Sequence, residues 1–206
     1  SVLWQRNNVN VSASISWTPD GKYLTVPRFD GSDFNILDLN GNRLHDSPLD
    51  EFGYSSDRRF SCHPSGQYFA TTVSLNCVGI FEIGSSIPLQ LIQLPKLKYI
   101  DAIKWSPNGL RMLVFGSDSV ADLLNLVNVT NGEVEFSSSI NYSIPLQDLT
   151  VNNPWAPDGN RFFMECDADE GAAVCDANFR IIYRMHRFRR YRMYGPSYLW
   201  NPSGTA

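Results

Sequence analysis

Short apolar segments separated by polar turns run along the whole chain, and they return in the same order every 43 to 50 residues. Each cycle has an apolar segment before a turn, a strand-like run after it, and two further β-rich segments. In the second cycle these read "RRFSC", "QYFATTV", "CVGIFEI" and "LQLIQL". Short runs rich in β-branched and aromatic residues, bounded by turn residues, are typical of strands. The pattern therefore predicts four short strands per cycle.

One turn marks each cycle, as "SWTPDG", "SCHPSG", "KWSPNG", "PWAPDG" and "LWNPSG". Pro presets φ at the first central position, and Gly supplies the positive φ that lets the next strand start in hairpin register. The flat Trp ring is predicted to fill the wedge between neighbouring sheets, and Cys62 replaces it in the second copy. The turn residues are Trp17, Pro19, Gly21, Pro64, Gly66, Trp105, Pro107, Gly109, Trp155, Pro157, Gly159, Trp200, Pro202 and Gly204.

Self-similarity at this period predicts an all-β fold, a β-propeller of four-stranded antiparallel blades. A two-sheet sandwich is the alternative, but it does not need an in-register Trp-x-Pro-x-Gly. We expect residues 1–206 to form a single propeller domain or a propeller fragment. The repeats are placed at about 11–55, 56–99, 100–146 and 147–193, with a partial blade from 194–206 together with 1–10.

Strand assignment within the fourth repeat follows the spacing of the first three. We predict "FRIIYRM" as its third strand and "RFRRYRM" as its fourth and outermost strand. The fifth turn comes near the end of the chain, so four full repeats leave about half a blade. Propellers usually hold about 4 to 8 blades. Three interpretations stay open: a piece of a longer ring, a ring closed by both termini, or a ring completed by a second copy.

The turns and third strands resemble those of known repeat families. "WTPDGKYLTV" and "WSPNGLRMLVF" are similar to the repeats of TolB-type and WD-repeat propellers, and "FNILDLNGNRL" resembles the third strand and following turn of a WD repeat. No repeat carries the Trp-Asp ending or the Gly-His pair, and Leu37-Asp38 is the nearest match to the former. The resemblance therefore implies a degenerate, TolB-like propeller, and it says little about function.

Composition narrows the class of protein. Of 206 residues, 43% are hydrophobic and 18% charged, and the net charge is −4. This balance disfavours nucleic acid or anionic lipid as a general partner, and no stretch approaches the roughly 18 apolar residues of a membrane span. The four cysteines form no CxxC pair, so zinc-ribbon spacing is absent. The compartment stays open.

Basic and aromatic residues interleave between Phe179 and Tyr194. Such a segment can grip an acidic partner or a nucleic acid, but charges on both faces of a strand are also typical of an exposed sheet edge. We favour the edge strand. The candidate binding residues here are Arg184, Arg187, Arg189, Arg190 and Arg192.

The hairpin loop "ECDADEGAAVCD" contains the remaining candidate chemistry. Its carboxylates resemble a short calcium-loop fragment but lack the further ligands and the late Glu of a complete loop, so no metal site is predicted. If the hairpin is symmetric, Cys166 and Cys175 face each other across two strands. That arrangement would allow a disulfide in an oxidising compartment.

Catalytic signatures are weak. The chain has three His, no Gly-x-Ser-x-Gly elbow and no Gly-rich phosphate loop before a helix. A glycosidase-type carboxylate pair stays open because 21 Asp and Glu allow many pairings. We expect no cofactor and a non-catalytic binding scaffold. The alternative is a propeller-type hydrolase or lyase, or the accessory propeller of a peptidase.

Loops that lead into each innermost strand gather at one end of a propeller and can form a composite surface. They lie around residues 49–57, 95–99, 145–152 and 194–197 and contain aromatic residues and lysines, including Tyr54, Lys96, Lys98, Tyr99 and Tyr194. Aromatic residues on loops are typical of protein–protein interfaces. We therefore expect a protein or peptide partner, with Tyr54 and Tyr99 as candidate contacts.

Overall fold

The computed structural model describes residues 15–27, 34–44, 59–140, 154–165 and 172–185. Within these ranges every regular element is a strand, so the predicted all-β class is confirmed. The described part contains no helix long and apolar enough to cross a membrane.

Four antiparallel sheets, here called blades 1 to 4, follow one another along the chain. Blade 1 consists of β1 (Ser16–Trp17), β2 (Leu24–Pro27) and β3 (Phe34–Leu37). Blade 2 consists of β4 (Phe60–Cys62), β5 (Tyr68–Ser74), β6 (Cys77–Glu82) and β7 (Pro88–Gln93). Blade 3 consists of β8 (Tyr99–Trp105), β9 (Arg111–Ser117), β10 (Asp122–Asn128) and β11 (Val134–Ile140). Blade 4 consists of β12 (Arg161–Glu165), β13 (Ala172–Asp176) and β14 (Ile181–Met185).

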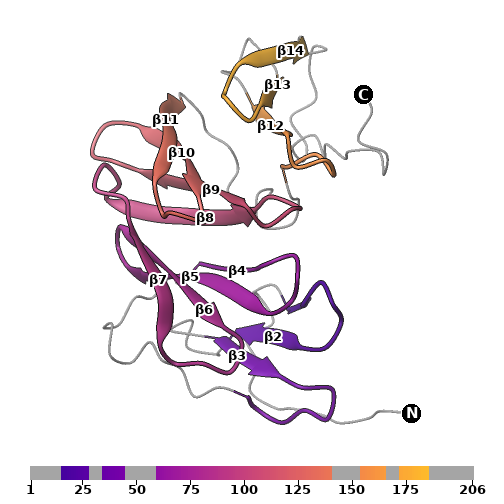
Figure 1. The fold of residues 1–206 in the computed structure, drawn as a ribbon. Coiled ribbons are helices and arrows are strands. Elements are labelled where there is room, and N and C mark those ends of the chain that lie inside the picture. The colour runs from indigo at the N-terminus through magenta and orange to yellow at the C-terminus, as the bar shows by residue number, and fades with distance from the viewer. Residues whose placement is uncertain (1–14, 28–33, 45–58, 141–153, 166–171, 186–206) are drawn as a thin grey trace, which may run out of the picture.

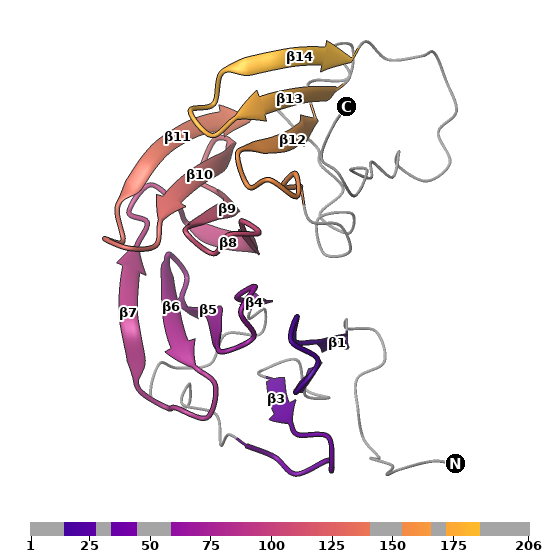
Figure 2. The same cartoon turned by 45° about the vertical axis from the view of Figure 1, so that its right-hand side comes forward.

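The blades stand side by side along an arc (Figures 1 and 2). Figure 2 shows β4, β8 and β12 on the inner side of the arc and β7, β11 and β14 on the outer side. Within the two complete sheets the strands pair in chain order from inside to outside. Isolated bridges at Arg43 and Trp155 add to blades 1 and 4 at the positions of a fourth and a first strand. This is the blade arrangement of a β-propeller.

The strand assignment of the fourth repeat was wrong by one strand. β13 is the third strand of blade 4, and β14, within "FRIIYRM", is the fourth. The sequence places "ECDADEGAAVCD" as the loop between the second and third strands, but its last five residues form β13 itself. The segment "RFRRYRM" lies outside the described residues.

Alternating strand positions place apolar side chains on both faces of each blade, and the core lies between blades. The first interface joins Ile36 of blade 1 to Phe69 and Phe81 of blade 2. The second joins Ile80 of blade 2 to Trp105 of blade 3, and the third joins Leu113 of blade 3 to Phe162 of blade 4. Burial on both faces explains why β5, β6, β9 and β10 are runs of mostly apolar residues instead of alternating apolar and polar ones.

The side chain of the residue directly before the Pro stabilises the repeated turn. In blade 3 the Ser106 hydroxyl donates to the Asn108 side-chain oxygen at 2.8 Å and accepts from the Arg111 N–H at 2.9 Å. Thr18 makes the same contacts with Asp20 and Tyr23 in blade 1, at 2.7 and 3.0 Å. The side chains therefore close the turn that Pro and Gly start.

The turn glycines also allow neighbouring blades to touch. A methyl group on Gly66 would overlap the Asp20 carboxylate of the preceding blade, and one on Gly109 would overlap the His63 ring. At Gly159 the same atom would lie 3.1 Å from the Asn108 amide nitrogen. Each turn thus places a polar side chain of one blade directly on the glycine of the next.

Two of the turn tryptophans lie between blades, Trp105 between blades 2 and 3 and Trp155 between blades 3 and 4. Trp105 and Trp155 are 3% and 2% exposed. Their indole N–H groups donate across the interface, Trp105 to the Ser61 carbonyl at 3.0 Å and Trp155 to the Lys104 carbonyl at 3.3 Å. Trp17 differs, because it is 55% exposed, on a face of blade 1 that no other described blade covers.

The turn between the third and fourth strands is also repeated. The Asp38 carboxylate accepts from the Asn40 and Asn42 N–H groups, and the Asp176 carboxylate from those of Asn178 and Arg180. In this turn of blade 1 the residue with a positive φ is Gly41.

In blade 4 the residue with positive φ is Phe179, at φ 61°. A left-handed conformation is unfavourable for a residue with a side chain. The Phe179 ring stacks on Phe136 of blade 3 with centroids 4.1 Å apart and meets Phe162 edge-on at 4.9 Å. These aromatic contacts stabilise the strained backbone and join blades 3 and 4 near their outer strands.

We predict that Gly109→Ala destabilises the protein much more than Gly21→Ala. Both glycines have φ near +70°, so both variants lose about 1–2 kcal/mol to backbone strain. Only at Gly109 does the new methyl group meet His63, which is itself packed against Trp105 and Tyr68. An additional loss of roughly 1–3 kcal/mol is expected there.

Urea unfolding of the two variants measures this difference. The double variant His63→Ala/Gly109→Ala should recover part of the additional loss, because the overlapping ring is gone. Equal losses in Gly109→Ala and Gly21→Ala would show that the contact between turns contributes nothing.

Candidate functional site

Three loops of blades 2 and 3 meet at one end of the propeller. Leu75 and Asn76 connect β5 to β6, residues 94–98 connect β7 to β8, and residues 118–121 connect β9 to β10. The Leu94 N–H donates to the Asn76 carbonyl at 2.8 Å, and the Lys98 N–H donates to the Ser117 carbonyl at 2.7 Å. These bonds tie the loops together.

The loop between β7 and β8 is anchored by its central residue. Leu97 is 3% exposed and packs into the core between blades 2 and 3. Its N–H donates to the Leu94 carbonyl at 2.9 Å, and its side chain would lie 3.0 Å from a Cβ on Gly116. With Leu97 directed inward, the neighbouring Lys96 and Lys98 are exposed.

Tyr99 follows this anchor and is 46% exposed. The Lys98 ammonium lies over its ring, 5.7 Å from the centroid, within the range of a cation–π interaction. Tyr99 is the first residue of a paired strand and follows a buried anchor, so its backbone is fixed. A Tyr ring in such a place offers apolar area to a partner and loses little side-chain entropy on binding.

Asp118 shapes the third loop. Its carboxylate accepts from the Val120 and Ala121 N–H groups at 2.6 and 2.7 Å, and these bonds lower the pKa of the carboxyl. The loop therefore holds Val120 outward, at 93% exposure, and Leu75 of the first loop is also exposed. We call the surface formed by Leu75, Lys96, Lys98, Tyr99 and Val120 the loop platform.

The opposite end of the blades uses its carboxylates to build turns. The Thr18 hydroxyl lowers the pKa of Asp20, and bonds from Asn42 and Asn40 lower that of Asp38. Asp158 pairs with Arg161 at 2.7 Å. Each of these carboxylates is thus a structural acceptor.

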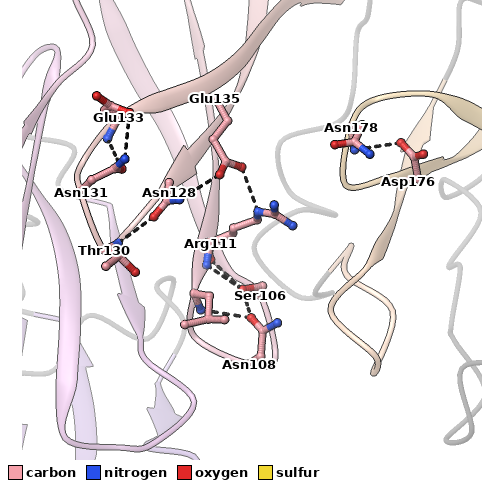
Figure 3. A network of polar contacts seen from close by, with 11 residues as sticks. Ser106, Asn108, Arg111, Asn128, Thr130, Asn131, Glu133, Glu135, Asp176 and Asn178 are labelled. Carbon is pink, nitrogen blue, oxygen red and sulfur yellow. Dashed lines mark hydrogen bonds and ion pairs between the residues drawn. The ribbon is translucent and has the colours of Figure 1, made fainter.

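Figure 3 shows a polar network at this opposite end of blade 3. The Glu135 carboxylate accepts from Arg111 at 2.8 Å and from the Asn128 amide at 2.9 Å. Asn128 in turn accepts from the Thr130 N–H at 2.9 Å. The network joins three strands and the turn between β10 and β11, which is again a structural use of charge.

Of the predicted binding residues, the structure describes Tyr99 and Arg184. Tyr99 lies on the loop platform, and Arg184 is exposed on β14, the outer strand of blade 4. The other predicted residues, Tyr54, Arg187, Arg189, Arg190 and Arg192, lie outside the described residues, as do the fifth turn and three of the four predicted loops. The structure therefore does not bring these arginines and Tyr99 into one described site.

The register of blade 4 changes the cysteine hypothesis. β12 and β13 pair Phe162 with Cys175 and Glu165 with Ala172. A symmetric hairpin would place Cys175 opposite Cys166, whereas in the structure Cys175 lies opposite Phe162. Cys166 lies outside the described residues, together with the Asp167–Gly171 part of the acidic loop.

Cys62, which stands where the other repeats have Trp, is half-buried. Burial, and to a smaller extent the Asp20 carboxylate of blade 1, raise the pKa of its thiol to about 12. Such a thiol is inert at neutral pH. Across the described ranges, no group of three His, Cys, Asp or Glu is placed to hold a metal ion.

Lys104 is a residue that the sequence analysis missed. It lies on the inner strand β8, two positions after Ala102, which packs against blade 4. Burial lowers the pKa of its ammonium to about 8. One feature of the sequence could have revealed it. At the corresponding position the first, second and fourth repeats have the uncharged residues Ser16, Ser61 and Pro154. Leu75 and Val120 were missed because nothing marks isolated apolar loop residues as exposed.

Comparison with known proteins supports the fold. No family model and no curated protein matches the chain. Among solved structures, it is similar to the β-propeller domain of Cps50 (Swd1) from Myceliophteria thermophila, with a TM-score of 0.61 and 13% identity over 90% of this chain and 57% of that one. It is also similar to hydrazine synthase from Kuenenia stuttgartiensis, with a TM-score of 0.61 and 15% identity over 88% of this chain and 51% of that one.

At these identities the likeness concerns the fold alone. The chain spans a little over half the length of the solved chains that it matches. The four-stranded antiparallel blades, their strand order and the similarity to solved propellers show that the chain has a β-propeller fold.

We predict that Lys104→Met stabilises the protein at pH 7. The folded-state pKa of about 8 lies below the ordinary value of 10.5, so the folded state binds the proton less readily than the unfolded chain. The destabilising contribution of Lys104 is therefore fully present below pH 8 and is lost as pH increases from 8 toward 10.5. Removing the amine should add about 1–3 kcal/mol at pH 7.

Urea unfolding at pH 7, 8 and 9 measures this effect. The gain in Lys104→Met should shrink as the pH rises, whereas the exposed Lys98→Met should leave stability nearly unchanged. A gain that is the same at all three pH values would contradict a buried ammonium at this position.

Proposed function

We propose that this chain is a non-catalytic β-propeller scaffold whose loop platform binds a protein or peptide segment that is acidic and carries an aromatic or aliphatic residue. The observation that carries the proposal is the exposure of Tyr99 beside two lysines, on a loop that Leu97 anchors in the core. A rigid loop loses little entropy when it binds, which favours affinity.

The chemistry of the platform defines its ligand. Tyr99, Leu75 and Val120 offer apolar area, and exposed tyrosines are frequent at the energetic centre of interfaces. Lys96 and Lys98 supply positive charge, while the nearby Asp118 carboxylate is engaged by two backbone N–H groups. Although the whole chain has a net charge of −4, this end of blades 2 and 3 therefore suits an acidic partner.

The alternative hydrolase interpretation has less support. In a hydrolase, carboxylates with shifted pKa values are expected to converge in a cleft. Here the lowered pKa values of Asp20, Asp38 and Asp118 all come from hydrogen bonds that shape turns. Within the propeller class we also propose the degenerate, TolB-like type, because the third strands end in Leu37-Asp38, Phe81-Glu82, Val127-Asn128 and Cys175-Asp176 instead of Trp-Asp.

A phage-displayed library of random 12-residue peptides tests the proposal. Selection on the full chain should enrich peptides with several Asp or Glu around an aromatic or aliphatic residue. For a selected synthetic peptide, Tyr99→Ala should weaken binding at least tenfold, the effect of a hot-spot side chain. Lys98→Glu should also weaken it and reduce its dependence on salt.

Leu110→Ala is the matched control. Leu110 is exposed on the turn at the opposite end of the same blade, so this variant should bind normally. Thermal unfolding of all three variants should match the wild type. Enrichment of neutral or basic peptides, or binding that survives Tyr99→Ala and Lys98→Glu together, would rule out the loop platform as the binding surface.

A further inference from the structure

Arg59 has a buried donor that the described residues leave unsatisfied. The Nε atom of its guanidinium is shielded from solvent and has no hydrogen-bond partner among them. Two other arginines of the blades are paired, Arg111 with Glu135 at 2.8 Å and Arg161 with Asp158 at 2.7 Å. A buried donor without an acceptor costs free energy, and the cost is larger when the group is charged. Arg59 therefore has a bonding capacity that its own fold does not use.

Arg59 lies at the same end of the blades as the loop platform. It directly precedes the inner strand β4, just as the platform loop 94–98 precedes β8. Its N–H donates to the Thr72 hydroxyl at 3.1 Å, and its carbonyl accepts from the Thr72 N–H at 3.1 Å. Thr72 belongs to β5, the strand that leads into Leu75 of the platform. The backbone of Arg59 is thus fixed at the loop end of blade 2.

The side chain of Arg59 faces blade 3. β4 and β5 pair Ser61 with Ala70, so two residues further toward the loop end Arg59 is opposite Thr72. Opposed residues share a face of the sheet, and so do residues two apart on one strand. Because Ala70 packs into the core between blades 2 and 3, Arg59 lies on the face toward blade 3. The inner strand of that blade is β8, which lies beside β4 and begins with Tyr99 (Figure 2).

The chemistry of a guanidinium defines the group that it binds. Its N–H groups form a planar fork that matches the two oxygens of a carboxylate. A carboxylate held there would satisfy Nε, and surroundings that exclude water would strengthen the bond. Arg59 is half-buried, so part of the side chain stays open to a partner. Its charge has the same sign as those of Lys96 and Lys98 on the loop platform.

We propose that Arg59 is a second contact for the acidic partner, which places a carboxylate on the guanidinium while an apolar residue of the same segment covers Tyr99. The carboxylate comes from an Asp or Glu side chain or from a free C-terminus. The inference rests on the proposed function and extends it, because it names the group on the partner that fixes the position of the bound segment. Lys96 and Lys98 then attract the partner, and Arg59 anchors it.

Urea unfolding of the free chain separates a binding residue from a structural one. If Arg59 stabilised the fold through a bond within the chain, Arg59→Met would lower the urea midpoint. Because its Nε has no acceptor among the described residues, we expect the midpoint to rise instead. Arg111→Met is the matched control. It removes the bond to Glu135 and should lower the midpoint.

Isothermal titration calorimetry with a selected acidic peptide tests the contact itself. Arg59→Gln should weaken binding at least tenfold, as for the loss of a charge-assisted hydrogen bond. Arg180→Gln, at an exposed arginine of blade 4, should leave binding unchanged. Each Asp or Glu of the peptide is then replaced by its amide, and the C-terminus is amidated in a further peptide. One of these changes should have no additional effect in Arg59→Gln, and that change identifies the source of the carboxylate.

Failure of this inference is distinguishable from failure of the proposed function. Peptide binding that needs Tyr99 but is unchanged in Arg59→Gln would overturn the inference alone, and so would a lower urea midpoint in Arg59→Met. If selection enriches no acidic peptide, the proposed function fails and sodium succinate becomes the probe. A saturable rise in the thermal midpoint of the wild type that is lost in Arg59→Gln would then support a carboxylate site at Arg59, and equal responses of the two proteins would overturn it.

Discussion

The contact between consecutive turns limits how closely the blades can approach, and the rest of the structure depends on that distance. Asp20 and His63 lie on Gly66 and Gly109 so closely that no other residue type fits without movement. The same turn positions the Trp indole, which donates to the preceding blade and closes the interface beside the apolar core. Sheet packing alone is non-directional, whereas these polar contacts fix which strands meet.

Features that recur in every repeat could be predicted from the sequence, whereas features that differ between the repeats could not. The β class, the turn and the buried Trp followed from period and composition, because each copy supplies the same local signal. The outer strands of blade 4 could not be placed, since the acidic loop disturbs the spacing on which the prediction relied. The position of Cys175 opposite Phe162 was not foreseen for a related reason, because hairpin register depends on strand pairing that no local residue specifies.

The candidate site was predicted in part for the same reason. The loop at residues 95–99 was found from its place in the repeat, and its Tyr and Lys types indicated binding. Whether Tyr99 is exposed depends on Leu97, which reaches the core of two blades and turns its neighbours outward. Leu75 and Val120 join the platform only through hydrogen bonds between loops and within them. Such tertiary contacts have no signature in the local sequence.

Charge is divided between the two ends of the blades according to its use. At the turn end, Asp20, Asp38 and Asp158 accept hydrogen bonds from nearby donors, so their charge contributes to local stability. At the loop end, Asp118 accepts in the same way from two backbone N–H groups, and the loop between β7 and β8 carries Lys96 and Lys98 and no carboxylate. A chain with a net negative charge can therefore attract an acidic partner, because local charge at the point of contact matters more than the total.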